Sequence, residues 1–474
     1  MPRLFGTDGI RGQAGGFPLD DGSVFSLGRT LAESLRRRRL EPRVLVGRDT
    51  RESGPRIEAA LTAGIRAGGG SVAAAGIIPT PAVPALVLRR GMAAGVMISA
   101  SHNPYRDNGL KFFDARGMKL AEEWEDELER GLADAARDPE AVGAERRGEA
   151  EGGFPGASPD PARPAAPVSG IPEASSQAGP AADYMDFLLS RFKATPGGRR
   201  LRLVLDCANG AAYDLGPRLF RGLGFEVETI ACRPDDRNIN EECGSQHPGR
   251  LAAKVVESGA DMGIAWDGDA DRAVWVDEKG RALNGDHTLY VQGRRLKEAG
   301  RLAGDVVVAT TMSNMGLERA LGRMGVRLER TRVGDKYVLE RMRELGAALG
   351  GERSGHTIFL EDGPAGDGLL TALKMAEALV ESGGPLSALV KGLDEYPQEL
   401  VNVPVARKPD LETVPEVREA LAAVRAELEG RGRIDVRYSG TENVARVMVE
   451  ADDPELVRRC ARRAAAALAR NLGA

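Results

Sequence analysis

The sequence predicts an α/β fold divided into several domains. Short apolar runs, typical of strands buried in a sheet, alternate with amphipathic segments along most of the chain. This alternation favours βαβ units and mainly parallel sheets. A chain of 474 residues is also too long for a single core.

Composition is that of a globular protein, with 42% hydrophobic and 28% charged residues, and the net charge is −5. Nucleic-acid binding needs a concentrated basic surface, so the acidic balance predicts no nucleic-acid partner. The one dense basic cluster, Arg36 to Arg39, ends a helical segment that begins near Val24. Cations are favourable at the C-terminal end of a helix dipole, so we interpret the cluster as a solvated helix end.

The four cysteines form no CxxC motif and are typical of reduced thiols in a cytosolic protein. Cys243 and His247 resemble half of a zinc site but lack a second ligand pair. The N-terminus has no apolar signal core, and no apolar run is long enough to span a bilayer. We therefore expect a cytoplasmic protein that has no membrane partner.

The elements expected in the first half follow one another closely. Strands are predicted at 43–47, 71–78, 95–100, 201–206 and 226–230, and helices at 24–35, 56–67, 81–90, 122–136 and 184–192. Residues 151–180 interrupt this order, because twelve of the thirty are Pro or Gly. Such a stretch buries too little apolar surface to offset its ordering entropy, so we interpret it as a flexible insertion or linker.

The second half continues the pattern. Strands are predicted at 262–266, 273–276, 305–310, 434–438 and 447–450, and helices at 316–324, from 331 onward, and at 454–471.

A serine motif follows the strand at 95–100, in the run Ser101-His102-Asn103-Pro104. Pro104 disfavours helix at Asn103, so the strand should end in a loop with the Ser101 hydroxyl at the mouth of the sheet, beside His102. Lys111 follows closely and could fold back over this loop. A hydroxyl near cationic groups suits a site that carries or transfers an anion. The alternative is a turn held by local capping bonds.

The first motif in the chain, Phe5 to Gly12, contains three glycines and Arg11. Glycines let backbone amides approach an anion, and the guanidinium adds a fixed fork of donors. The alternative is a glycine-rich hairpin.

An acidic loop, Asp267-Gly268-Asp269-Ala270-Asp271-Arg272, joins two predicted strands. Three carboxylates at alternating positions can converge on one hard cation, and so small a site suits Mg²⁺. An EF-hand calcium loop would match Asp267, Asp269, Asp271 and Glu278, but its sixth position must be Gly and here it is Arg272. A solvated acidic turn is the remaining alternative.

Two further loops carry polar groups. Glu352 and Ser354 could bond to vicinal hydroxyls, and His356 could shuttle a proton; the alternative is a plain glycine-rich loop. Near the C-terminus, Arg437-Tyr438-Ser439-Gly440-Thr441 precedes Arg446, and this combination of arginines, hydroxyls and a glycine turn is typical of a phosphate clamp.

Four of these loops, at 101–104, 267–272, 351–356 and 437–441, resemble those of the α-D-phosphohexomutases in their order and spacing. The resemblance covers nearly the whole chain apart from residues 151–180. Within the family the chain looks most like the bacterial branch that acts on glucosamine phosphates, through the motif at 5–12 and the stretches 238–247 and 309–318. It departs in two places: Asn443 stands where the family usually has Pro, and Arg353 where this branch commonly has Gln.

The resemblance implies four domains around a central cleft. Three would be α/β sandwiches with mixed or parallel sheets, at 1–182, 183–285 and 286–396, and a smaller α+β domain would occupy 397–474. It also implies that Ser101 is stored as phosphoserine and that one Mg²⁺ per subunit binds Asp267, Asp269, Asp271 and a phosphoryl oxygen.

The implied activity interconverts glucosamine 6-phosphate and glucosamine 1-phosphate through a sugar bisphosphate, which also serves as activator. The clamp of Arg437, Ser439, Gly440, Thr441 and Arg446 would hold the phosphate that is not reacting, and Glu352 and Ser354 would bind the sugar. Lys111, Arg11 and His356 are the candidates for proton transfer. His102 would lie beside the nucleophile, and Arg272 would neutralise the transferred group.

Two other functions stay open. One is phosphomannomutase or phosphoglucomutase activity in the same family, and the other is a sugar-phosphate or Ca²⁺ sensor without turnover. The substrate partner is a hexosamine phosphate, and a homodimer is left open as the assembly.

Overall fold

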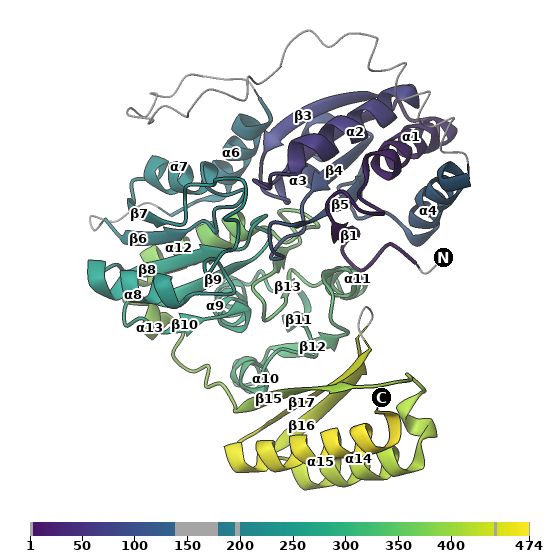
Figure 1. The fold of residues 1–474 in the computed structure, drawn as a ribbon. Helices are drawn as coiled ribbons and strands as arrows, with labels where there is room; N and C mark the ends of the chain where they lie inside the picture. The colour runs from purple at the N-terminus through teal and green to yellow at the C-terminus, as the bar shows by residue number, and fades with distance from the viewer. Residues whose placement is uncertain (1–2, 138–178, 195–199, 440–442, 474) are drawn as a thin grey trace. The chain divides into compact units, whose positions relative to one another are not determined.

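The structure is a computed structural model that describes residues 3–137, 179–194, 200–439 and 443–473 (Figure 1). Contacts within the chain divide it into two compact units. The first unit contains Met1–Leu283 and Ser354–Ser387, and the second contains Asn284–Arg353 and Ala388–Ala474. The chain thus leaves the first unit after Leu283, returns to it at Ser354 and leaves it again after Ser387.

The first sheet has five strands in the order β1-β5-β4-β2-β3. Its strands are β1 (Ile10–Gln13), β2 (Arg43–Arg48), β3 (Ser71–Ile77), β4 (Ala94–Ile98) and β5 (Asp107–Asp114). β2 runs parallel to β3 and β4, whereas β5 is antiparallel to both β4 and β1. Because β2 and β4 are parallel neighbours, the loops that follow them meet at one edge of the sheet.

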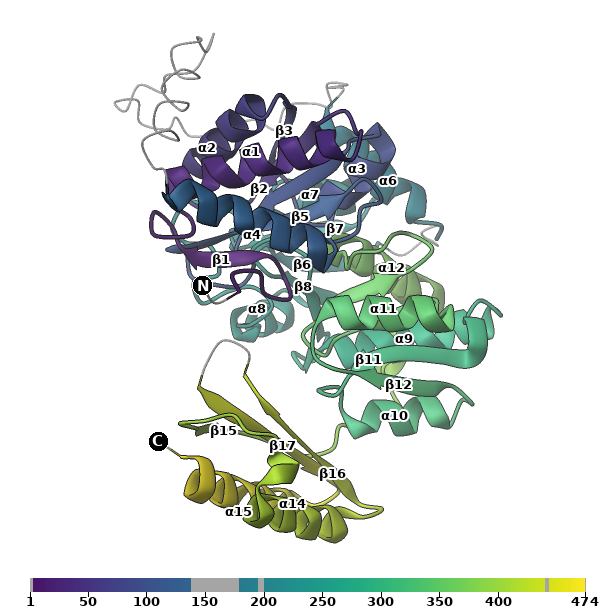
Figure 2. The same ribbon diagram turned by 90° about the vertical axis from the view of Figure 1, so that its right-hand side faces the viewer.

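Helices cover both faces of this sheet (Figure 2). On one face lie α1 (Asp21–Arg37), α2 (Gly54–Ala67) and α4 (Glu122–Arg137), which share one apolar core with β2 and β4. The other face carries α3 (Ala82–Arg90), which packs so closely that a Cβ on Gly95 would come within 2.6 Å of Val83. β4 is therefore buried on both faces, as its apolar sequence predicts.

The basic cluster at the end of α1 lies where the sequence predicts it. Asp20 caps the start of the helix by accepting a bond from the Ser23 N–H, and Arg36 and Arg37 occupy the last turn.

The second sheet also has five strands, in the order β10-β9-β8-β6-β7. Its strands are β6 (Arg202–Asp206), β7 (Glu226–Ile230), β8 (Met262–Trp266), β9 (Ala273–Asp277) and β10 (Ala282–Leu283). β6 is parallel to β7 and β8, and β8 is antiparallel to β9. The acidic loop at 267–272 therefore connects two adjacent antiparallel strands.

Four helices belong to the second sheet: α6 (Pro180–Arg191), α7 (Leu215–Gly222), α8 (Gly249–Ser258) and α12 (Gly368–Ser382). α8 packs on one face through Leu251 and Val255. On the other face Trp266 meets Phe220 of α7, with ring centroids 6.3 Å apart, and a Cβ on Gly368 would meet the same indole at 2.8 Å. α12 follows the short strand β14 (Thr357–Phe359), so a late segment of the chain completes this layer.

The second unit begins with a parallel arrangement in which β11 (Val306–Thr310) lies between β12 (Arg327–Thr331) and β13 (Leu349–Gly351). Its helices and short turns are α9 (Gly285–Glu298), the 3₁₀ turn η1 (Ala303–Asp305), α10 (Met315–Gly322) and α11 (Asp335–Leu345). A short helix, α13 (Leu386–Leu389), follows α12.

The C-terminal part of the second unit is an antiparallel sheet in the order β15-β17-β16. Its elements are β15 (Gln398–Pro404), the 3₁₀ turn η2 (Leu411–Thr413), α14 (Pro415–Leu428), β16 (Gly432–Tyr438), β17 (Val444–Ala451) and α15 (Pro454–Leu472). The two long helices lie side by side on one face of the sheet (Figures 1 and 2) and share its apolar core.

The predicted architecture of α/β domains with a smaller C-terminal α+β domain is confirmed. The central cleft and the domain boundaries at 182, 285 and 396 stay predictions. Most of the predicted linker at 151–180 lies outside the described residues; at its end, Pro180 already begins α6. Among the described helices, none has the length and apolar character that a membrane span requires.

Candidate active site

Ser101 stands in a tight turn directly after β4. Its φ of 53° is in the left-handed region, which non-glycine residues rarely adopt outside functional or strained sites. The side chain is fully buried. Its hydroxyl donates to Asp267 Oδ2 at 2.6 Å and lies 3.2 Å from His102 Nδ1. The predicted serine loop and the predicted acidic loop therefore meet at this hydroxyl.

A buried ion pair behind the loop fixes this turn. Arg51 Nε donates to Asp49 Oδ2 at 2.8 Å, and its Nη2 donates to the carbonyls of Ser101 and Asn103 at 2.8 and 2.9 Å. The Ser99 hydroxyl donates to the same Asp49 oxygen at 2.6 Å and accepts the Ser101 N–H at 2.9 Å. Both charged side chains are fully buried. Sequence reasoning missed this pair. The polar run that follows β2 would have indicated it only if β2 and β4 had been recognised as parallel neighbours, because their loops then meet.

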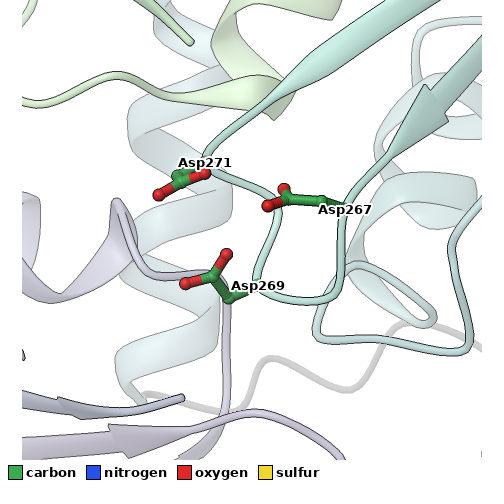
Figure 3. Close-up of side chains that lie close together, drawn as sticks. All are labelled: Asp267, Asp269 and Asp271. Atoms are coloured by element: carbon green, nitrogen blue, oxygen red, sulfur yellow. The ribbon is translucent and has the colours of Figure 1, made fainter. Parts of the chain in front are cut away.

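The acidic loop brings three buried carboxylates together (Figure 3). One oxygen from each of Asp267, Asp269 and Asp271 lies within 4.8 Å of the others. Gly268 allows the loop to approach the serine turn, because a Cβ there would meet the Ser101 carbonyl at 2.6 Å. This is the cluster of oxygen donors that the sequence predicts.

Lysine 111 lies among carboxylates from two loops. Lys111 Nζ lies 2.8 Å from Asp269 Oδ2, 3.1 Å from Asp271 Oδ2 and 2.9 Å from Asp8 Oδ2. Asp8 also pairs with Arg11 at 2.6 Å and with Lys119 Nζ at 2.7 Å. The N-terminal motif therefore acts here through a carboxylate, Asp8, which sequence reasoning did not single out.

The charged side chains of this cluster have pKa values that are shifted in different directions. Burial, followed by repulsion from Asp271 and Asp269, raises the pKa of Asp267 well above its usual range. Burial alone would also raise the pKa of Asp271 and lower that of Lys111. Several opposite charges together outweigh burial: Lys111 and Arg272 lower the pKa of Asp271, and Asp269, Asp271 and Asp8 raise the pKa of Lys111. The ammonium form of Lys111 is thus the stable one at neutral pH.

The donor set fits a small hard cation. Asp269 Oδ1 and Asp271 Oδ1 are buried and have no hydrogen-bond partner. Orphaned carboxylate oxygens of this kind are costly unless a cation or donor meets them. Oxygen ligands with room for a phosphate oxygen suit Mg²⁺.

Three more predicted residues surround the serine. Arg272 Nη1 lies 3.3 Å from His102 Nδ1. Burial, and then the charges of Arg272 and Arg11, lower the pKa of His102 to about 4, so its ring is neutral at pH 7. His356 pairs through its backbone with Arg272 and is buried. The structure therefore gathers the predicted catalytic and metal residues within the first unit.

The predicted sugar-binding loop straddles the two units. Glu352 belongs to the second unit, where its Oε1 accepts the Gly334 N–H at 3.1 Å. Ser354 is exposed and begins the segment of the first unit. Between them Arg353 Nη2 binds Glu395 Oε1 at 2.9 Å, and its Nη1 lies 3.8 Å from Asp286 Oδ2.

The predicted phosphate clamp lies at the end of the antiparallel pair β16 and β17. Arg437 and Arg446 are directly opposite each other in the strand register. Burial, and then the charge of Arg446, lower the pKa of Arg437. Ser439 is buried, and its carbonyl accepts a bond from Lys408 Nζ at 2.8 Å. Lys408 is a further cation here that the sequence motif did not include, and Gly440 and Thr441 lie outside the described residues.

Comparison with known families shows the class of protein. The four domain models named phosphoglucomutase/phosphomannomutase match the chain: alpha/beta/alpha domain I at 2–138, domain II at 182–280, domain III at 284–396 and the C-terminal domain at 400–467. The chain belongs to this family, the α-D-phosphohexomutases.

Relatives across the whole length give a narrower class. The chain is 45% identical over 459 residues to the phosphoglucosamine mutase of Heliobacterium modesticaldum, covering 96% of each chain. A phosphoglucomutase/phosphomannomutase family protein of Burkholderia thailandensis has a TM-score of 0.77 at 25% identity, covering 99% of this chain and 97% of that one.

A more distant structure shares the fold. The Aspergillus fumigatus N-acetylphosphoglucosamine mutase, solved in complex with GlcNAc-6P and magnesium, has a TM-score of 0.63 at 18% identity, covering 98% of this chain and 95% of that one.

Proposed function

We propose that the chain interconverts glucosamine 6-phosphate and glucosamine 1-phosphate through a phosphoserine at Ser101. The chain is a phosphohexomutase, an isomerase of the family established above. The observation that carries the proposal is the 2.6 Å contact between the Ser101 hydroxyl and Asp267. It places a nucleophile-type oxygen against a buried cluster of metal-type ligands, as transfer of a phosphoryl group requires. The full-length relatives support the amino sugar as substrate.

The reaction conserves the phosphoryl groups. The phosphoryl group on Ser101 Oγ passes to the free hydroxyl of the sugar monophosphate, so one O–P bond breaks, another forms, and a sugar bisphosphate results. The bisphosphate turns end for end and returns its other phosphoryl group to Ser101. A sugar bisphosphate therefore also primes protein that lacks the phosphate.

Asp267, Asp269 and Asp271 would hold one Mg²⁺ per subunit. The ion would supply positive charge to the phosphoryl oxygens. Lys111 and Arg272 add positive charge from this chain, and positioning supplies much of the remaining catalysis.

The charge state of each side chain indicates whether it can accept or donate a proton in the reaction. Neutral His102, 3.2 Å from the serine hydroxyl, is suited to accept its proton. Lys111 in its ammonium form is suited to donate. His356 and Arg11 remain the other candidates for the proton on the sugar oxygen.

Substrate binding is assigned to the sugar-binding loop and the phosphate clamp. Glu352 and Ser354 would bond to sugar hydroxyls, while Arg437, Ser439, Gly440, Thr441 and Arg446 would hold the distal phosphate. Lys408 joins this clamp as a cation. A cytoplasmic location and a homodimer remain predictions that go with this function.

The phosphoserine is tested by mass spectrometry and one substitution. Intact protein should carry phosphate on Ser101, and Ser101→Ala should lose turnover by more than about a thousandfold, because the nucleophile is removed. Ser71→Ala, at an exposed strand position, is the matched control and should keep turnover. Unchanged turnover in Ser101→Ala would overturn the proposal.

The sugar is tested by a panel. Catalytic efficiency is compared on glucosamine, mannose and glucose phosphates, each primed with its bisphosphate and Mg²⁺. Preference for the amino sugar is expected; preference for mannose or glucose would assign the alternative activity, for which the departure at Arg353 is the reason to look. Binding without turnover on every sugar would favour the sensor.

A further inference from the structure

Two cysteines lie together at the end of the second sheet. Cys207 directly follows β6 and Cys232 follows the neighbouring parallel strand β7. Their sulfurs are 3.1 Å apart, although 25 positions separate them in the chain. Both are free thiols, and nothing in the catalytic scheme uses them.

The two thiols differ in environment. Cys207 is fully buried, whereas Cys232 is partly exposed, so a solvent-borne reagent can reach Cys232 first. The contact with Cys207, which outweighs desolvation, lowers the pKa of Cys232. Burial raises the pKa of Cys207 well above the usual range. A more acidic, accessible thiol beside a buried partner has the form of an attacking and resolving pair.

The turn that begins at Cys207 contacts both loops of the candidate active site. Thr50 Oγ1, one residue from Arg51, donates to the Asn209 carbonyl at 2.6 Å. The Ala211 N–H donates to the Gly268 carbonyl in the acidic loop at 2.8 Å. Ala208 and Asn209 both have positive φ, at 53° and 47°. Movement of Cys207 would therefore be passed to the loops that hold Ser101 and the carboxylates.

The Ser101 loop has a second link to the same turn. The Asn240 N–H donates to the Ala208 carbonyl at 2.9 Å, and its side-chain amide donates to the Ser101 carbonyl at 2.9 Å. The dithiol is thus connected to the nucleophile by backbone and side-chain bonds of the described residues.

We propose that Cys207 and Cys232 are an oxidation site, at which hydrogen peroxide forms a disulfide that lowers turnover. The Cys232 thiolate attacks a peroxide oxygen, which gives a sulfenic acid and water after proton transfer. The Cys207 sulfur then displaces the sulfenic oxygen as a second water, and the S–S bond forms. In sum, two thiols and one peroxide give one disulfide and two waters. The thiols lose two electrons, which reduce the peroxide.

The consequence for activity follows from geometry. A disulfide holds its sulfurs about 2.05 Å apart, so the pair must close by roughly 1 Å. A shift of this size in a positioned loop is enough to lower kcat by about tenfold or more. This effect on turnover rests on the proposed function, whereas formation of the disulfide does not.

The experiment treats the full-length protein with peroxide and then maps its thiols. Trypsin should place Cys207 in the peptide 203–218 and Cys232 in the peptide 222–237, because the bond between Arg233 and Pro234 resists cleavage. We expect these two peptides to be joined after peroxide and separated by dithiothreitol, with turnover falling about tenfold and returning on reduction. Alkylation of both thiols after peroxide, or a sulfinic acid on Cys232 alone, would overturn the site.

Variants separate the two parts of the inference. Cys232→Ser, at a partly exposed position, should keep turnover in the reduced state and become insensitive to peroxide. Cys243→Ser is the matched control and should keep both the cross-link and the sensitivity. A joined peptide pair with unchanged turnover would overturn the connection to Ser101. Loss of turnover in the reduced wild type would instead count against the proposed function.

Discussion

The two candidate phosphate sites balance charge in opposite ways. Around Ser101, every cation described faces a carboxylate: Arg51 faces Asp49, and Lys111 faces Asp269 and Asp271. In the second unit, Arg437 and Arg446 stand opposite each other, and the carboxylate of Asp435 lies 3.9 Å from Arg437 Nε. The first arrangement pairs its cations with carboxylates and holds a nucleophile in a fixed turn. The second gathers like charges, which a phosphate would relieve. The comparison indicates that one site is built to react and the other to hold.

The largest expected effect comes from breaking the buried pair in the first site. Arg51→Ala leaves Asp49 charged and buried, so unfolding free energy should fall by about 3–5 kcal/mol. Urea unfolding measures this. Arg56→Ala is the matched control: its pair with Asp21 is 45% and 34% exposed, and its loss should cost less than about 1 kcal/mol. Equal losses in both variants would contradict the role of Arg51 and Asp49 as a buried pair that fixes the serine loop.

Asp367 is a buried carboxylate that is held by neutral hydrogen-bond donors, so its effect on stability should depend on pH. Asp367 accepts bonds from the Leu370 N–H at 2.9 Å and the Tyr184 hydroxyl at 2.8 Å, and burial raises its pKa from 3.8 to about 6. The folded state therefore binds a proton that the unfolded state has released. The contribution of Asp367 to the free energy of unfolding is therefore fully present below pH 4 and is lost as the pH rises through 6.

Asp367→Asn removes that loss while keeping a donor and an acceptor. At pH 8 the variant should be more stable than the wild type by up to about 3 kcal/mol, and the gain should vanish near pH 4. Urea unfolding across this range is the measurement. A difference that does not change with pH would contradict the assigned charge state.

The acidic cluster is tested by its metal. Asp269→Asn should weaken Mg²⁺ binding, measured by calorimetry, by about a hundredfold, because an anionic ligand is lost. The matched control is Glu278→Gln. Glu278 would be a ligand of an EF-hand, but here its Oε2 accepts the Ser387 N–H at 3.1 Å, so Mg²⁺ affinity should not change. Weaker binding in the control would favour the calcium-type loop.

The smallest effect is expected in the second unit. Arg437→Ala removes one of two like charges, so stability should stay within about 0.5 kcal/mol while KM rises about tenfold. Arg459→Ala, on an exposed face of α15, is the control and should change neither. A stability loss as large as that of Arg51→Ala would show that the clamp arginines are structural.

Where the sequence predicts an element, the structure has one close to the predicted range, whereas β5, α12 and α14 are among the elements that local pattern did not predict. The strands at 226–230 and 262–266 match their predicted ranges, and the helix from Pro454 ends one residue later than expected. The motifs Ser101-His102 and Asp267 to Asp271 were found because a hydroxyl and alternating carboxylates stand out at strand ends. Asp8, Asp49 and Arg51 were missed, since their links to the site are to residues distant in sequence: Asp8 to Lys111, Asp49 to Ser99 and Arg51 to the Ser101 carbonyl.

The amino-acid sequence by itself determined the α/β class, the loops that carry chemistry and the residue types suited to phosphoryl transfer, because periodicity and strand-end chemistry are local properties. The tertiary structure decided that Ser101 meets Asp267, that Lys111 is held as an ammonium between two loops, and that Cys207 meets Cys232. These depend on strand order, and strand order follows from how whole sheets bury their faces rather than from any single segment.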